Sequence, residues 1–380
     1  MTKKILYIFI GFNILALLAT SLYFLFTYNK VFVKPTPPKV EPGSLLPSAT
    51  PTPDPDAPIS VLLLGYGGGT HDGGLLTDSI ILARLQPKTK QVFLVSIPRD
   101  LWVYLPLKEN EDIPFKINSA YAWGSSTTQY LSRPQQYTGD AGGGQLAKDT
   151  LQKVLGVPID NFVALDFQAF QKTIDTLGGI DVKVQRSFDD PLYPLEDPEI
   201  DETCGKSEEE IAALTATISG LKLEEQFSCR YEQLHFDSGL QHMDGSTALK
   251  FARSRHSPTD GGDYNRSSRQ KLVIEAVKNK IFSINFLPKA IPFINTLSYH
   301  LKTDLSLKDI EKHIARAAEY KDYEIISFAI TEDNLLEQGR SSTGQFILAP
   351  KAGETDYSEI HQTLKNLFEN MTPTPTPSIR

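Results

Sequence analysis

Charged residues directly after an apolar run mark the first stretch of the sequence that could do chemistry. The run VFLVSI, from Val92 to Ile97, is typical of a buried central strand, and Pro98 should end it because proline cannot donate to a sheet. Arg99 and Asp100 follow, and charge at the edge of a core needs a partner because unpaired burial is costly. These two residues either pair with each other or form an anion-binding arginine beside a metal-binding or orienting aspartate.

Two further stretches contain arginines at spacings that suit a shared ligand. Arg253 and Arg255 are two residues apart, and an extended backbone would point both guanidinium groups to one side. A helix from Asp263 onward would place Asp263, Arg266 and Gln270 at i, i+3 and i+7 on one stripe. The N-terminus of such a helix is itself an anion site, because its N–H groups are unpaired and its dipole is positive there.

A phosphate-rich ligand bridged by a divalent metal is the chemistry that these residue types favour. Arginine recognises phosphate through two parallel hydrogen bonds, and Mg²⁺ is usually held by one or two carboxylates plus substrate oxygens. The sequence therefore suggests a pyrophosphate or polyphosphate site, in which Arg269, on a neighbouring helix face, would be the fifth arginine. The simpler alternative for each stretch alone is a solvated face or a structural Arg–Asp network.

Composition narrows the class of protein. The chain has 380 residues, of which 40% are hydrophobic, and this is enough for one large core or two smaller ones. The net charge of −8 argues against a nucleic-acid partner. Cys204 and Cys229 are the only cysteines; they fit no metal-binding motif, and they could form one disulfide if the domain lies outside the cytoplasm.

The N-terminal region has the features of a membrane anchor. Residues 5–28 carry no charge and are long enough to span a hydrocarbon core of roughly 30 Å. A cleaved signal peptide would have an apolar region of about 7–15 residues and a small-residue cleavage site, so we expect an uncleaved transmembrane helix. Lys3 and Lys4 suggest that residues 1–4 are cytoplasmic, although Lys30 and Lys34 on the other flank weaken this orientation. The protein would then cross the cell membrane once, with its bulk extracellular.

Low-complexity segments separate the anchor from a single folded region. Residues 29–58 are rich in proline and should form a disordered, extended linker. Residues 371–380 read as a disordered tail, which leaves residues 59–370 for the folded domain. Within this domain, the acidic segment 189–230 is predicted to be an irregular surface insertion.

Strand and helix patterns alternate through the folded region. Strands are predicted at residues 59–64, 77–85, 91–97, 180–184 and 323–330. Helices are predicted at residues 145–155, 167–177, 244–251, 263–282, 288–299, 305–320 and 358–368. This order predicts an α/β (α+β) fold with a mixed central β-sheet flanked by helices.

Taken together, these motifs resemble the LytR-CpsA-Psr family, membrane-anchored enzymes of bacterial cell envelopes. The matching motifs occur in the family's order and cover nearly everything after the linker. They are VLLLG from Val61, LTDS from Leu76, VSIPRDLWV from Val95, KINSAYAWG from Lys116, LDFQAFQKTIDTLGGIDV from Leu165, DGSTALKFARSR from Asp244 and DYNRSSRQ from Asp263.

The resemblance implies a channel for a polyisoprenoid chain and a phosphotransferase activity in cell wall biogenesis. A glycopolymer would move from an undecaprenyl (polyprenyl) pyrophosphate carrier to peptidoglycan, which creates a phosphodiester, and Mg²⁺ (or Mn²⁺) would be the cofactor. One alternative is a hydrolase of the same lipid pyrophosphate, with water as the acceptor. Another is a non-catalytic, lipid-binding regulator of the envelope.

The resemblance also carries roles over to particular residues. Asp78 matches a metal ligand, and Asp100 and Asp263 match acidic positions of the site, either of which would accept the proton of the attacking hydroxyl. Lys116 and Asn118 match a motif with a supporting role. The positions that match pyrophosphate contacts are Arg99, Arg253, Arg255, Arg266 and Gln270, and Arg99 would also stabilise charge during catalysis.

Two departures from the family pattern concern the glycine-rich loop of residues 65–74. The family commonly has an aspartate soon after the first strand and an arginine just before the motif of Asp78, and both are absent here. Asp72 or His71 could replace the missing ligand, and a carboxylate suits Mg²⁺ better than an imidazole does. Asp72 is therefore the predicted second metal ligand, and the alternative is that the loop is only a flexible turn.

The anchor leads to the first testable prediction. Protease added to intact cells should remove the domain, because an uncleaved helix at residues 5–28 would leave it outside the membrane. Immunoblotting of the treated cells measures this loss, with a cytoplasmic protein as the control that must survive. Protection of the domain, or a mature N-terminus beyond Tyr28, would contradict the prediction.

Overall fold

The computed structural model describes residues 31–36, 54, 56–69, 73–109, 111–139, 141–195, 202–283 and 300–369. The chain divides into one compact unit of Met1–Thr173 and Asn285–Arg380 and a second of Ile174–Ile284. The predicted transmembrane helix at 5–28, most of the linker, the predicted helix at 288–299 and the tail lie outside the described residues. Within the described ranges, no helix is long and apolar enough to cross a membrane.

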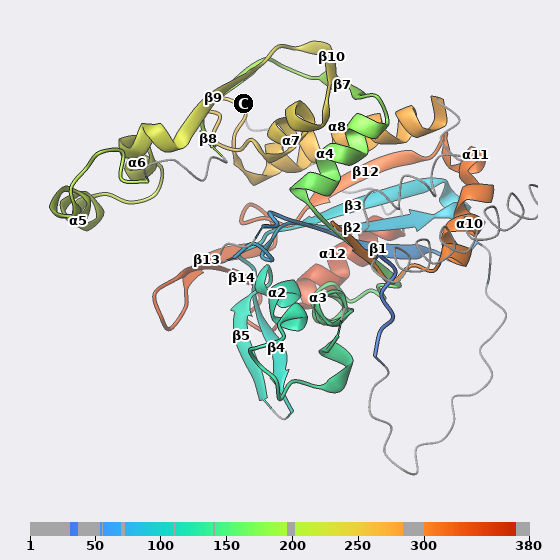
Figure 1. Cartoon of the computed structure of the whole chain (residues 1–380). Coiled ribbons are helices and arrows are strands. Elements are labelled where there is room, and N and C mark those ends of the chain that lie inside the picture. Colours follow the sequence, from blue (N-terminus) through green and yellow to red (C-terminus); the bar gives the residue numbers. More distant parts are fainter. Residues whose placement is uncertain are drawn as a thin grey trace, which may run out of the picture. The chain divides into compact units, whose positions relative to one another are not determined.

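A six-stranded mixed sheet forms the centre of the first unit, which confirms the predicted α/β class (Figure 1). Its strand order is β11-β6-β1-β2-β3-β12. The pairs β1–β6 and β3–β12 are parallel, whereas β2 runs antiparallel to both β1 and β3. The strands are β1 (Ile59–Tyr66), β2 (Thr77–Gln86), β3 (Gln91–Ile97), β6 (Asn161–Asp166), β11 (Leu301–Thr303) and β12 (Glu324–Ala329).

The core of this unit lies where helices cover one face of the sheet. Leu62, Leu82 and Phe93 project from three adjacent strands and are almost completely buried. The covering helices are α3 (Gly142–Leu155) and α12 (Ser358–Phe368), both close to their predicted bounds. Leu151 of α3 and Leu364 of α12 belong to the same apolar cluster as the strand residues. Burying such a side chain contributes roughly 1.5–3 kcal/mol, which is why the apolar stripes fix these helices on the sheet.

Smaller elements complete the first unit. A hairpin of β4 (Trp102–Lys108) and β5 (Glu111–Lys116) follows β3, and α2 (Ser119–Ser125) comes next. Two more strands form a separate antiparallel pair, β13 (Leu336–Arg340) and β14 (Phe346–Pro350). The short 3-10 helices are η1 (Pro87–Thr89) and η2 (Gln135–Tyr137).

The helix predicted at residues 305–320 is two helices. These are α10 (Leu307–Ala315) and α11 (Ala317–Tyr320), separated by Arg316. Arg316 leaves helical geometry with φ −95° and ψ 3°, while its guanidinium bonds Glu319 and Asp56. The apolar residues keep their helical spacing across this break, so the sequence pattern did not reveal the interruption.

The second unit is built on two antiparallel strand pairs and two helices. The pairs are β7 (Ile180–Val184) with β10 (Gly239–Met243) and β8 (Phe188–Pro194) with β9 (Tyr231–Phe236). The helices are α7 (Gly245–Arg253), capped by Asp244, and α8 (Gly262–Ser283). The helix α4 (Phe167–Thr176), capped by Asp166 as predicted, contains the boundary between the units. The aromatic rings of Phe188, Phe236 and Phe251 form the core here, with centroids 5.2–6.1 Å apart.

The segment 189–230, predicted to be irregular, contains regular structure. It includes most of β8, and helix α5 (Glu208–Thr217) follows a capping box of Ser207 and Glu210. The short elements α6 (Leu221–Glu224) and η3 (Glu225–Arg230) come after α5, which has no buried residue. A disulfide joins Cys204 to Cys229, as one of the two sequence-based alternatives expected, and it ties the two ends of this helical segment together.

Candidate functional site

Four charged side chains meet in the first unit. Arg99 Nη1 lies 2.7 Å from Asp78 Oδ1, and Arg99 Nε lies 3.6 Å from Asp100 Oδ2. Lys116 Nζ lies 2.6 Å from Asp100 Oδ1. We call Asp78, Arg99, Asp100 and Lys116 the charged cluster. Arg99 contacts its neighbour Asp100, as the first alternative expected, and pairs more closely with Asp78; anion and metal binding stay predictions.

Strand register explains why Asp78 and Arg99 meet. Strands β2 and β3 are antiparallel, and Ile80 pairs with Ile97. Asp78 is two residues before Ile80, and Arg99 is two residues after Ile97. If the same register continued, Asp78 and Arg99 would lie opposite each other. Pro98 ends the ladder between them and thereby frees Arg99 from the sheet.

The KINS motif holds the charged cluster in place through its backbone. Asn118 accepts hydrogen bonds from the N–H and the hydroxyl of Thr77 at 3.0 and 3.2 Å, and its own N–H donates to the carbonyl of Arg99. Lys116 pairs with Trp102 across the β4–β5 hairpin, which brings its ammonium to Asp100. The motif therefore joins the amino end of β2 to the residues that follow β3.

Tyr66 and the ion pair of Asp166 with His300 lie at the same edge of the sheet. Because β1, β3 and β6 are parallel and β2 is reversed, the carboxyl ends of β1 and β6 lie beside the amino end of β2. Tyr66 pairs with both Thr77 and Asp166 there. Burial raises the pKa of Tyr66 to about 12, with the charge of Asp166 adding to the shift, so the phenol stays neutral. His300 Nδ1 lies 2.6 Å from Asp166 Oδ2.

Sequence reasoning recognised Asp166 only as a helix cap. It missed the contact of Asp166 with His300 and its position beside Tyr66. The available signal was its position at the end of a parallel strand, where polar residues reach the same edge as Arg99. Gly68 passes so close that a Cβ atom there would lie 3.0 Å from Asp166 Cβ, and its φ of +81° also favours glycine. The glycine-rich loop thus begins against Asp166.

The carboxylates of the charged cluster have the donor chemistry that Mg²⁺ prefers. Asp78 and Asp100 both contact Arg99, and the side chain of Asp78 is 45% exposed. Two carboxylates suffice for Mg²⁺ when a phosphate substrate supplies the remaining oxygens. Among the described residues no group of three His, Cys, Asp or Glu side chains is close enough to hold a metal alone. Asp72, the predicted second ligand, and His71 lie outside the described residues.

The second unit contains the remaining predicted residues. Arg266 Nη2 lies 3.0 Å from Asp263 Oδ1 on α8, which confirms that these residues share one stripe, and Gln270 is on the same helix. The extended geometry predicted for residues 253–255 is wrong at Arg253, which is the last residue of α7; the chain leaves the helix from Ser254 onward. Arg253 donates to the hydroxyl of Tyr193 at 3.0 Å, while Arg255 Nε donates to the ring of His256.

A buried aspartate orders the loop that carries Arg255. Asp190, 1% exposed, accepts hydrogen bonds from the Ser254 hydroxyl at 2.6 Å and from the backbone N–H groups of Arg255 and His256. Three donors on one carboxylate fix the backbone between α7 and α8. Sequence reasoning assigned Asp190 only to the insertion, because these three donors are more than sixty residues away.

Arg269 is a structural residue and not a fifth surface arginine. It is 2% exposed, and its Nη1 donates to the carboxylate and the carbonyl of Asp260 at 2.8 and 2.9 Å. Its Nη2 donates to the carbonyl of Ser254, and its guanidinium lies over the ring of Phe188. Burial lowers the pKa of Arg269, and the charge of Asp260 opposes this shift. Arg269 therefore ties the loop between α7 and α8 to α8.

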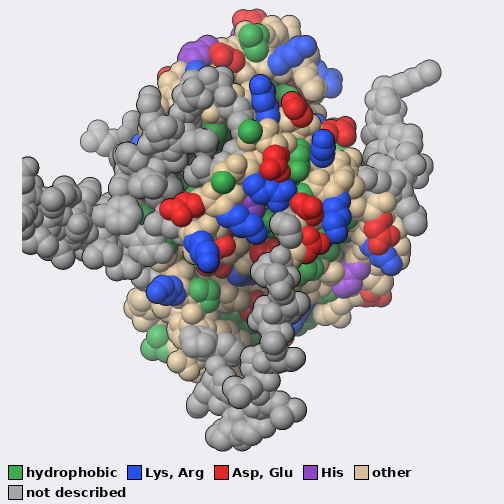
Figure 2. All heavy atoms as spheres, turned by 90° about the vertical axis from the view of Figure 1, so that its right-hand side faces the viewer, with side chains coloured by type: hydrophobic (Ala, Val, Ile, Leu, Met, Phe, Trp, Pro, Cys, Tyr) green, Lys and Arg blue, Asp and Glu red, His purple; other side chains and the backbone are tan. Residues whose placement is uncertain are grey.

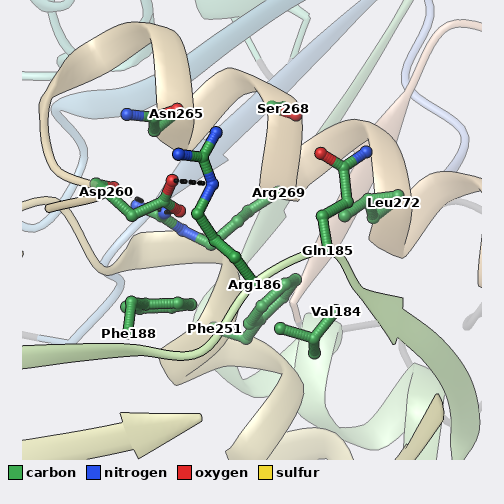
Figure 3. Close-up of a pocket in the computed structure, with 10 residues that line it drawn as sticks. All are labelled: Val184, Gln185, Arg186, Phe188, Phe251, Asp260, Asn265, Ser268, Arg269 and Leu272. Atoms are coloured by element: carbon green, nitrogen blue, oxygen red, sulfur yellow. Dashed lines mark hydrogen bonds and ion pairs between the residues drawn. The ribbon is translucent and has the colours of Figure 1, made fainter. Parts of the chain in front are cut away.

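Figure 3 shows a pocket that Asp260 and Arg269 help to line, a space of about 30 Å³ that holds little more than one water. Arg186 contacts the other carboxylate oxygen of Asp260, with its Nε 3.4 Å from Asp260 Oδ1 (Figure 3), and its side chain is 66% exposed. Asp260 thus has one buried and one exposed arginine partner. On the face shown in Figure 2, the coloured Lys and Arg side chains likewise lie close to Asp and Glu.

Comparison with known proteins identifies the family. The family model of LytR_cpsA_psr matches residues 38–358, and the chain belongs to this family. A polyisoprenyl-teichoic acid–peptidoglycan teichoic acid transferase, TagU of Enterococcus faecalis, is 28% identical over 312 residues, which cover 81% of this chain and 79% of that one. TagU of Bacillus licheniformis is 28% identical over 253 residues, covering 67% of this chain and 62% of the relative.

A solved structure shows the same fold. The crystal structure of B. subtilis TagV has a TM-score of 0.53 to this chain at 24% sequence identity, covering 84% of this chain and 99% of that one. The resemblance inferred from the motifs is therefore confirmed at the level of family and fold.

The two partners of Asp260 provide a matched test of the role of Arg269. Arg269→Met should lower the free energy of unfolding by about 3–5 kcal/mol, because it leaves a buried carboxylate without its main partner. Arg186→Gln should cost at most about 1 kcal/mol, because that ion pair is exposed to solvent. Denaturant unfolding followed by circular dichroism measures both. Equal effects of the two substitutions would show that Arg269 does not tie the loop to the helix.

Proposed function

We propose that the protein is a membrane-anchored, Mg²⁺-dependent phosphotransferase that moves a glycopolymer from a polyprenyl pyrophosphate carrier to peptidoglycan. The observation that carries the proposal is the charged cluster, in which one arginine holds two carboxylates at the edge of the sheet where strands end. Family membership and the names of the transferase relatives support it. The substrate of this chain is inferred by that analogy.

The bond changes of the proposed reaction balance without a covalent enzyme intermediate. A hydroxyl oxygen of peptidoglycan attacks the phosphorus that carries the glycopolymer, and the pyrophosphate P–O bond breaks. The products are a phosphodiester and polyprenyl phosphate, and the hydroxyl proton goes to a carboxylate, Asp100 or Asp263. Arg99, with a side chain 35% exposed, is accessible to the phosphate and would stabilise its growing charge.

The other predicted residues would hold the metal, orient Asp100 or contact the pyrophosphate. Mg²⁺, held by Asp78 and Asp72, would supply positive charge against the pyrophosphate oxygens. Lys116 keeps Asp100 oriented through its ion pair. The further residues proposed to contact pyrophosphate are Arg253, Arg255, Arg266 and Gln270.

The disulfide supports an extracellular location for the domain. Disulfides persist in oxidising compartments and are rare in the cytosol, and Cys204 and Cys229 are paired. Residues 5–28 would provide the anchor to the cell membrane. A site beside the outer leaflet could receive a carrier that is itself embedded in the membrane.

A transfer assay tests the proposed function. The full chain, supplied with lipid-pyrophosphate-linked glycopolymer and peptidoglycan, should release polyprenyl phosphate and yield polymer bound to the peptidoglycan. Arg99→Ala should lower the rate of transfer by about thirtyfold or more, since truncating one member of a hydrogen-bonded charge pair costs about 2–5 kcal/mol. Arg340→Ala is the matched control, because Arg340 is exposed on β13 and bonds a loop carbonyl.

The products of the same assay separate the alternatives. Free polymer without attachment to peptidoglycan would mean a hydrolase. Bound lipid with no turnover at any metal concentration would mean a non-catalytic lipid-binding protein. Either result would refute the transferase assignment.

The metal requirement gives a separate prediction. Asp78→Ala should abolish transfer, whereas Asp72→Ala should raise the Mg²⁺ concentration needed for half-maximal activity with a smaller change at saturating metal. The reason is that a second carboxylate adds affinity while phosphate oxygens and water still complete the coordination. Titration of activity with Mg²⁺ measures both. An Asp72→Ala enzyme with unaltered Mg²⁺ dependence would show that the loop supplies no ligand.

A further inference from the structure

A pocket of about 220 Å³ in the first unit is not accounted for by the chemistry proposed above. It lies between the β4–β5 hairpin, α3 and the loop that precedes α12, and no residue of the charged cluster lines it. Figure 1 shows these elements together below the central sheet. Sites that enclose a drug-sized ligand measure roughly 300–1,000 Å³, so this pocket suits a smaller group.

One buried hydroxyl in the pocket lacks a partner. Thr150, on α3, is 3% exposed, and its Oγ1 has no hydrogen-bond partner among the described residues. A buried polar atom without a partner costs free energy, and most such atoms in proteins are paired with protein or ordered water. The Oγ1 atom is itself inaccessible to solvent, so a ligand hydroxyl or amide would reach it only after the Thr150 side chain rotates, and the new hydrogen bond would then remove this cost.

The rim of the pocket carries both signs of charge. Lys153 Nζ lies 3.8 Å from Asp112 Oδ2, a loose pair whose side chains are 65% and 44% exposed. Beside it, the hydroxyl of Tyr104 donates to Glu354 at 2.9 Å. The two carboxylates outnumber the single ammonium group, so an anion would be repelled here. A neutral group with hydroxyls can accept from Lys153 and donate to Asp112 at the same time.

Two tyrosines give the pocket apolar surface. Tyr104 and Tyr357 both line it and are partly exposed. Tyrosine presents an aromatic face together with a polar hydroxyl, and such faces pack well against the C–H groups of a sugar ring. The small pocket thus combines aromatic surface, a hydrogen-bond acceptor, a hydrogen-bond donor and a buried unpaired hydroxyl. This combination suits a pyranose ring.

The pocket lies close to the charged cluster along one strand. Tyr104 is two residues after Trp102 on β4, which is about 7 Å at the usual strand rise. Trp102 pairs with Lys116, whose ammonium contacts Asp100. A short oligosaccharide seated in the pocket could therefore extend to the cluster.

We infer that this pocket binds one sugar residue of an uncharged glycan strand. That this strand is the peptidoglycan acceptor, and not the donor polymer, rests on the proposed function. A polyol phosphate polymer carries negative charge at every repeat and would meet Asp112 and Glu354, whereas the glycan backbone of the acceptor would not. The pocket would hold that strand while the neighbouring hydroxyl reacts.

Direct binding tests the inference without any need for turnover. Isothermal titration of the full chain with a β-1,4-linked N-acetylglucosamine tetramer should show binding in the millimolar range or tighter. Thr150→Val, which keeps the shape of the side chain, and Asp112→Asn should each weaken binding by about five- to tenfold through loss of hydrogen bonds. Glu111→Gln is the matched control, since Glu111 lies on the same hairpin, pairs with Lys108 and does not line the pocket.

Thermal unfolding of each variant shows that a loss of binding is not a loss of fold. No binding to the wild-type chain, or equal binding by Asp112→Asn and the Glu111→Gln control, would overturn the inference. Tight binding of a glycerol phosphate oligomer that Lys153→Gln abolishes would overturn the assignment to an uncharged glycan.

Kinetics separate a failure of the inference from a failure of the proposed function. In the transfer assay, Asp112→Asn should raise the KM for the acceptor about five- to tenfold while kcat and consumption of the lipid donor stay unchanged. If the chain transfers no polymer but binds the tetramer in a Thr150-dependent way, the pocket assignment stands and the transferase proposal falls. If it transfers polymer with an unchanged acceptor KM in Asp112→Asn, the inference is refuted and the transferase proposal stands.

Discussion

The ion pair between Arg99 and Asp78 is the interaction on which the arrangement of the first unit's site depends. It exists because two antiparallel strands end in register, and because Pro98 ends the ladder just before the arginine. Once Arg99 is held there, its Nε also reaches Asp100, and Lys116 completes the set. These opposite charges hold one another in place at a partly exposed edge of the unit.

The reversed direction of β2 makes this gathering possible. In a sheet of parallel strands only carboxyl ends would reach the edge where Arg99 lies, whereas β2 brings an amino end there, with Thr77 and Asp78. The hydrogen bonds of Thr77 with Asn118 fix that end from outside the sheet. The backbone of one motif thus positions the side chains of two others.

Sequence could predict the elements more readily than the contacts. The apolar run before Pro98, the cap Asp166 and the stripe of Asp263 with Arg266 are local signals, and the structure agrees with each. The pairing of Asp78 with Arg99 needed the strand register, and the burial of Arg269 needed the position of Asp260. The start of helix α5 could have been predicted from the sequence, because Ser207 and Glu210 have the spacing of a capping box. No local pattern could reveal that the hydroxyl of Thr150 lacks a partner.

The parallel pairing of β3 with β12 has a consequence for how the chain becomes folded. Gln91 pairs with Glu324, so the strand that precedes Arg99 gains its outer neighbour only when most of the polypeptide has been made. Until then, β3 is an open edge with unpaired N–H and C=O groups, which invites association with other chains. Such distant contacts also make folding slow. A chain interrupted anywhere before β12 would leave this edge uncovered, however well its earlier parts had folded.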